Sequence, residues 1–124
     1  MRNLLVGTML ALAAVAAHAT PQTQCQAWVN VISKQLPYNA DEVTTLTSVT
    51  CNDTTLIANY TVHDLPPGKY IEWNTAERIV IESACKQAAK NWMRDGITGL
   101  YIYKDVTGAF MHSLTFDRSN CSNT

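Results

Sequence analysis

The placement of four cysteines constrains the fold of this chain more than any other feature of its sequence. Cys25, Cys51, Cys85 and Cys121 are spread widely along the 124 residues, and none lies in the first 24. An even number of cysteines in a short exported chain is typical of a disulfide framework. A zinc site is the alternative, but it favours close CxxC pairs, and the spacings here are wide. We therefore expect a small domain held together by two disulfides.

The N-terminus has the parts of a secretory signal. Arg2 supplies a positive charge before the apolar run LLVGTMLALAAVAA, and small residues follow at Ala17 and Ala19. A membrane anchor is the alternative, but it would need about 20 apolar residues, and Thr20 and Pro21 interrupt the run too early. We expect residues 1–19 to be a signal peptide, with no membrane span in the remainder.

The expected compartment follows from this short signal, which has the compact form of bacterial ones. The protein would then be periplasmic or secreted. A lipid anchor would require a cysteine directly after the small-residue site, and Cys25 lies too far downstream for that.

The remaining residues, 20–124, fit a single domain, because about 100 residues are enough for one hydrophobic core and too few for two. Without Arg2 the chain has eight basic and ten acidic residues, a formal charge of -2. This near-neutral balance provides no basic surface for nucleic acid and no polybasic segment for anionic lipid.

Two helices are predicted. In residues 22–36 the apolar residues recur every three or four positions, which places them on one stripe of a helix that Pro37 ends: Cys25, Trp28, Ile32 and Leu36. The second helix begins at Asn74 as N-cap, with Glu77 three positions later, and ends at Gly96. Its buried stripe consists of Ile81, Cys85, Ala88 and Trp92.

Four strands are predicted from runs of β-branched and aromatic residues at 42–51, 54–63, 97–104 and 109–116. The turn Asn52-Asp53 joins the first two, and residues 105–108 join the last two. The expected fold is α+β with the order α-β-β-α-β-β, an antiparallel sheet carrying two helices on one face.

This order predicts how the cysteines pair. A strand that runs antiparallel to the preceding helix returns to the start of that helix, so Cys51 should meet Cys25. The tail after the fourth strand should bring Cys121 back along the second helix to Cys85. Each disulfide would close a loop of the unfolded chain and thereby stabilise the fold by about 3 to 4 kcal/mol in the chain-entropy model.

The search for catalytic chemistry finds no nucleophile, metal cluster or phosphate loop. His63 and His112 are the histidines that follow the signal, both lie in predicted strands, and no HExxH spacing surrounds them. We interpret them as sheet histidines with structural partners. We predict no catalytic residue, no metal ligand and no cofactor. A small hydrolase or metal-dependent enzyme with an unrecognised site is the alternative.

A segment between two predicted elements, DLPPGKYIEWN at 64–74, carries the residues that we expect to bind a partner protein. Tyr70, Ile71 and Trp73 are bulky side chains in a predicted loop, where aromatic residues commonly anchor interfaces. The alternative is that Ile71 and Trp73 pack under the second helix.

Two resemblances to known families rest on longer stretches. DEVTTLTSVT and LIANYTV, followed by ESACKQAAKNWMRDGITGLYIYKDVTGAFMHSLTFDRSNC, resemble the small secreted virulence factors regulated by quorum sensing in Pseudomonas. The second half is also similar to the β-type pilotins of type II secretion. In these a cysteine-bearing helix, a glycine, a Y-x-Y strand, a D-x-x-G turn and a terminal cysteine recur.

The pilotin resemblance implies an α/β domain that binds a helical tail of an outer-membrane secretin through a groove. It carries over Cys85 and Cys121 as the disulfide and places Tyr101 and Tyr103 on the sheet. Pilotins are lipoproteins, whereas this chain has no lipobox cysteine.

Together these observations predict a non-enzymatic periplasmic or secreted binding protein that acts through protein–protein contacts. Its role would be associated with virulence or with secretion. The partner would be an envelope or secretion component, and the oligomeric state stays open.

Export predicts a defined mature N-terminus. We expect N-terminal sequencing of the exported protein to begin at Thr20 or within a few residues of it, because signal peptidase reads the small residues Ala17 and Ala19. A stable pool that retains Met1 in the cytoplasm would contradict this prediction.

Overall fold

The structure is a computed structural model that describes residues 20–87 and 89–121. The expected signal peptide, residues 1–19, lies outside the described residues. Within the described ranges, no helix is long and apolar enough to cross a membrane.

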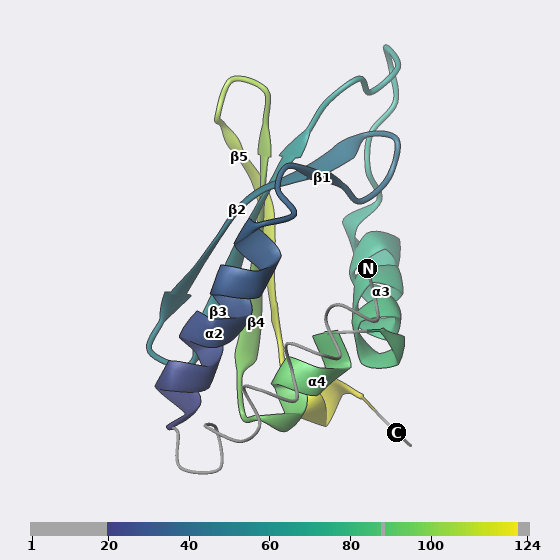
Figure 1. Cartoon of the computed structure of the whole chain (residues 1–124). Helices are drawn as coiled ribbons and strands as arrows, with labels where there is room; N and C mark the ends of the chain where they lie inside the picture. Colours follow the sequence, from purple (N-terminus) through teal and green to yellow (C-terminus); the bar gives the residue numbers. More distant parts are fainter. Residues whose placement is uncertain (1–19, 88, 122–124) are drawn as a thin grey trace.

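Five strands and three α-helices make up the described fold (Figure 1). The elements in chain order are α2 (Pro21–Ser33), β1 (Tyr38–Asn39), β2 (Thr44–Asn52), β3 (Thr55–Val62), α3 (Trp73–Lys86), α4 (Ala89–Arg94), β4 (Thr98–Asp105), β5 (Phe110–Phe116) and the short 3-10 helix η1 (Arg118–Asn120). The predicted α+β class is confirmed. The predicted order is wrong in detail, because it lacks β1 and treats α3 and α4 as one helix.

The sheet has the order β1-β2-β3-β4-β5 and is mixed, so the predicted purely antiparallel sheet is wrong. The two hairpins, β2–β3 and β4–β5, are antiparallel as expected, but β3 and β4 pair in parallel along their whole length. Parallel neighbours need a long crossover connection. The segment with α3 and α4 supplies that crossover, which places the two hairpins side by side.

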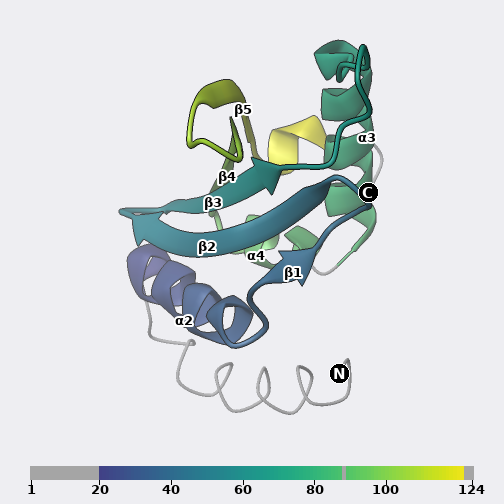
Figure 2. The ribbon, with the colours of Figure 1, turned by 90° about the horizontal axis from the view of Figure 1, so that it is seen from above.

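All three α-helices pack on the same face of the sheet, as expected for the helices of the predicted fold. Figure 1 shows α2 and α3 on two sides, with α4 near their lower ends, and Figure 2 shows α2 alongside β2. On this face Cys51 bonds to α2, Gly99 contacts α4 and Tyr103 contacts α3. The same face of the sheet carries Cys51, Gly99 and Tyr103, because side chains alternate between the two faces along a strand.

Local sequence explains where α2 begins. The Thr20 side chain accepts a hydrogen bond from the Thr23 N–H, and Pro21 occupies the first helical position, where its missing N–H costs nothing. The helix ends at Ser33, before the predicted limit at residue 36. The buried residues of α2 are Cys25, Trp28 and Val29.

The helix predicted from Asn74 to Gly96 differs in two ways from the structure. Glu72 is the N-cap, because its carboxylate accepts hydrogen bonds from the N–H and the hydroxyl of Thr75, so Trp73 already belongs to α3. The chain also leaves the helix at Gln87, where the backbone is extended. Cys85 in α3 bonds to Cys121, whereas Trp92 packs over Gly99 from α4, so two separate helices carry residues that were predicted on one stripe.

Predicted turn residues adopt the conformations that their types favour. Asp53 and Gly108 have φ angles of 58° and 88°, and Gly96 ends α4 with φ 84°. In the β4–β5 turn the Asp105 carboxylate accepts hydrogen bonds from the hydroxyl and N–H of Thr107 and the N–H of Ala109. These bonds, that of the Thr107 side chain above all, hold the pKa of Asp105 below its ordinary value.

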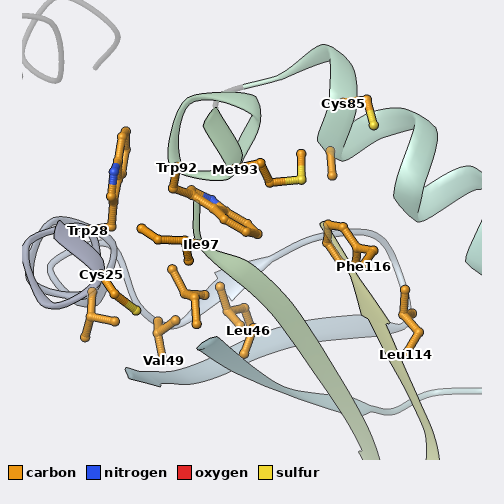
Figure 3. Packing of buried hydrophobic residues seen from close by; sticks show 14 of the residues in the cluster. Cys25, Trp28, Leu46, Val49, Cys85, Trp92, Met93, Ile97, Leu114 and Phe116 are labelled. Atoms are coloured by element: carbon orange, nitrogen blue, oxygen red, sulfur yellow. The ribbon is translucent and has the colours of Figure 1, made fainter. Parts of the chain in front are cut away.

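The core lies between the sheet, α2 and α4 (Figure 3). Trp92 is 3% exposed and packs over Gly99 beside Phe116, with ring centroids 6.0 Å apart. The indole N–H of Trp28 donates a hydrogen bond to Asp95 at 3.3 Å, which joins α2 to the end of α4.

Both predicted disulfides are confirmed. Cys25 bonds to Cys51 across 26 residues, and Cys85 bonds to Cys121 across 36 residues. The first fixes the start of α2 to β2, and the second fixes the end of α3 to the segment that follows β5.

The contact between Trp92 and Gly99 predicts the effect of a single methyl group. A Cβ at position 99 would lie 2.8 Å from Trp92 Cη2 and 3.0 Å from Phe116 Cζ. Gly99→Ala should therefore lower the free energy of unfolding by about 1 to 3 kcal/mol, as overpacking does. Denaturant unfolding of Gly99→Ala, Trp92→Phe and the double variant measures the coupling between the two sites. Strictly additive effects, or an unchanged stability of Gly99→Ala, would contradict the proposed clash.

Candidate partner-binding groove

An open groove of about 520 Å³ lies between α3 and the sheet. Its floor comes from β2, β3 and β4. One wall is α3 with Ile71, which precedes it, and the other wall is β1 with the turn after it. Most lining side chains are apolar or aromatic. The lining residues are Tyr38, Ala40, Asp41, Val43, Thr44, Leu46, Tyr60, Ile71, Trp73, Ala76, Ile79, Val80, Ser83, Ala84, Gln87, Tyr101 and Tyr103.

Tyrosines form the floor of the groove. Tyr60 on β3 is paired with Tyr103 on β4, and their rings stack with centroids 5.0 Å apart. Tyr101, two positions earlier on β4, faces the same side, and its ring centroid lies 5.1 Å from that of Tyr60. The Y-x-Y pattern in the sequence is the signal for this arrangement, since alternate residues of a strand share a face.

Burial makes these hydroxyls hard to ionise. It raises the pKa of Tyr60 far above its ordinary value, and the neighbouring Tyr101 and Tyr103 hydroxyls raise it further. Burial likewise raises the pKa of Tyr101 and of Tyr103. The floor is therefore a neutral aromatic surface at any physiological pH.

A cluster of four residues, which we call the α3 clasp, holds the start of α3 against the sheet. Trp73 stacks on the His112 ring of β5, with ring centroids 4.5 Å apart and ring planes 14° from parallel. The ring centroids of Trp73 and Tyr103 are 5.2 Å apart. Glu77, one turn further along α3, pairs with His112 Nε2. Since Trp73 and Glu77 share one face of α3, the helix binds His112 with both.

The electrostatic character of the groove is simple. Among the described residues that line it, Asp41 is the only one with a formal charge at neutral pH. Its carboxylate accepts a hydrogen bond from the Val43 N–H at 2.9 Å, which holds it in the turn between β1 and β2. The negative charge of Asp41 acts on the floor, where it contributes to the raised pKa of Tyr103 after the larger effects of burial and of Tyr101.

The structure separates the three residues predicted to bind a partner. Ile71 and Trp73 line the groove, and both are half-buried. Tyr70 is 83% exposed and does not line it. The prediction that all three lie in a loop is wrong for Trp73, because the Glu72 cap places it in α3. No local sequence pattern marks Tyr38, Asp41 or Ile79 as groove residues, because only the approach of α3 to β1 and the following turn brings them together.

The two histidines have separate partners. His63 binds the Thr45 hydroxyl and Asp64, each at 2.8 Å, whereas His112 belongs to the α3 clasp. No group of three His, Cys, Asp or Glu side chains in residues 20–87 and 89–121 is placed to hold a metal ion. Every cysteine is in a disulfide, so none is a thiolate nucleophile.

Comparison with known proteins identifies the fold. Neither a protein-family model nor a curated protein matches the sequence. Among solved structures, the chain is similar to EpsS, the pilotin of the type 2 secretion system of Vibrio vulnificus. The TM-score is 0.73 and the identity 10%, and the match covers 84% of this chain and 94% of the pilotin.

Two further structures are similar. The type II secretion pilotin AspS from Vibrio cholerae matches with a TM-score of 0.70 and 12% identity, over 82% of this chain and 92% of that one. A candidate secreted protein from Pseudomonas aeruginosa matches with a TM-score of 0.57 and 15% identity, over 83% and 97% of the two chains. The chain therefore has the fold of these pilotins, and the predicted pilotin resemblance is confirmed at the level of the fold. The resemblance to the quorum-sensing-regulated family stays a prediction.

The buried tyrosines predict an alkaline transition. The native state favours their neutral form, so their contribution to stability is complete below the unfolded pKa of about 10 and is lost as pH rises through the higher native values. In an alkaline titration followed by tyrosinate absorbance, three of the five tyrosines should ionise only as the protein unfolds. Tyr60→Phe should remove one third of that delayed change. Ionisation of all five before any loss of circular dichroism would contradict the prediction.

Proposed function

We propose that the protein is a non-enzymatic, exported binding protein that holds a helical segment of a secretion or envelope protein in the groove between α3 and the sheet. Residues 20–124 would be the mature domain, and residues 1–19 its signal peptide. The periplasm or the extracellular space is then its compartment.

The open aromatic groove is the observation that carries this proposal. Its tyrosine floor and its α3 wall together offer a concave apolar surface, which is the form taken by grooves that bind amphipathic helices. Ile79 is 55% exposed at the rim of the groove, where an apolar side chain gains energy only when a partner covers it.

The pilotin fold supports the same conclusion independently of the groove chemistry. Two of the similar structures are named as pilotins of type II secretion, and the resemblance expected from the sequence implies a groove that receives a secretin tail.

A virulence-associated role is the second part of the proposal. It rests on the sequence resemblance to the secreted Pseudomonas factors, and the similar fold of a candidate secreted Pseudomonas aeruginosa protein is in agreement with it. Both roles use the same binding surface.

Site-specific crosslinking in the source bacterium tests the proposal. A photoreactive phenylalanine analogue at Ile79 should give a discrete adduct with one secretion or envelope protein, identified by mass spectrometry. Val106 is the matched control, because it is also apolar and exposed, at 70%, but lies in the β4–β5 turn outside the groove. Trp73 is unsuitable as the probe position, since its replacement would also break the α3 clasp.

The groove itself is tested by filling it. Ser83→Trp, on the α3 wall, should reduce the Ile79 adduct at least several-fold while the protein keeps its melting temperature, because the added indole occupies the partner's place. Equal adducts at Ile79 and Val106, or an Ile79 adduct that survives Ser83→Trp, would contradict a groove-bound partner.

A further inference from the structure

We infer that the groove selects an amphipathic helix that carries a lysine or arginine at the end facing Asp41. This inference rests on the proposed function and deepens it, because it states the chemistry of the segment that binds and the direction in which it lies.

The helical form follows from the backbone groups that the groove offers. Its floor strands β2, β3 and β4 are paired on both sides at Leu46, Tyr60 and Tyr103, so their N–H and C=O groups are already used. The wall α3 is a helix with its own internal hydrogen bonds. Among the strands that line the groove, only β1 has an unpaired edge, and it is two residues long. An entering segment must therefore satisfy most of its own backbone groups, which a helix does and an extended strand does not.

The groove has a charged end and a neutral end. Asp41 lies in the turn at the end of the sheet where Thr44 pairs with Val62, and α3 begins at the same end, where Trp73 contacts Tyr103. The other end is lined by Ser83 and Gln87, which carry no charge. From Trp73 to Gln87 the helix rises about 20 Å. The length is enough for several turns of a bound helix.

No cation among the described lining residues neutralises Asp41. Its carboxylate accepts a hydrogen bond from the Val43 N–H, and the nearest charged neighbour in sequence, Glu42, is also acidic. On α3, Arg78 pairs with Glu82 and neither lines the groove. A basic side chain on the bound helix would meet the carboxylate at the rim of an apolar surface, where its alkyl stem can cover the aromatic floor.

Display libraries of amphipathic helices of about 15 residues, selected on the exported protein, test this inference. Positions at both ends of the peptide are randomised, and a second library has the alternating pattern of a strand. The wild-type selection should enrich helices with Lys or Arg at one end. For a selected peptide, Lys→Gln should weaken binding about two- to fivefold at low ionic strength, and the difference should shrink with added salt.

Matched variants locate the effect. Asp41→Asn keeps an oxygen for the Val43 N–H but removes the charge, so it should abolish the preference for Lys over Gln. Glu42→Gln changes the net charge equally, and its side chain does not line the groove, so it should keep the preference.

The outcomes separate this inference from the proposed function. Peptides that lose binding to Ser83→Trp, but show no basic preference or the same preference on Asp41→Asn, would overturn the charge selection and leave groove binding in place. Preferential enrichment of the strand library would overturn the helical form. If neither library yields binders that distinguish the wild type from Ser83→Trp, the proposed groove function fails and the inference fails with it.

Discussion

The Cys85–Cys121 disulfide sets the shape on which the groove depends. It fixes the end of α3 to the segment after β5, while two residues later the chain has already left the helix at Gln87 and turned toward the core. Because α4 then fills the space above Gly99, α3 does not have to cover the sheet centre. The helix is left as a wall, held by a covalent bond at one end and by the α3 clasp at the other. The surface between the two attachments stays open to solvent.

The α3 clasp contains residue types, such as a histidine beside a carboxylate, that also occur in catalytic sites. His112 has an aromatic ring stacked on it and a carboxylate beside it, but both partners come from the same face of α3 and close around the imidazole. The geometry joins a helix to an edge strand. It explains why a histidine and a tryptophan, far apart in sequence, belong to a structural contact beside the groove.

The groove combines neutral aromatic chemistry with a single fixed charge. Burial keeps the hydroxyls of Tyr60, Tyr101 and Tyr103 protonated, so the floor offers area and shape. In the inferred complex Asp41 would add direction, because one carboxylate at one end would distinguish the two orientations of a bound segment. Apolar area would then supply most of the affinity and the charge would supply specificity, a division found at many protein interfaces.

The sequence by itself determined the local features of this protein. Apolar residues at spacings of three and four placed Cys25 and Trp28 on the buried stripe of α2. The alternation of side chains along a strand placed Tyr101 and Tyr103 on one face of β4. The return of each strand to its helix determined both disulfides. Only the tertiary structure decided the parallel pairing of β3 with β4, since the direction of pairing between two hairpins depends on the path of the crossover. It also decided the break at Gln87, because residues 75–95 contain no glycine or proline and the Cys85–Cys121 bond that fixes the end of α3 spans 36 residues of sequence. The groove follows from both decisions, and its residues come from segments that no local pattern connects.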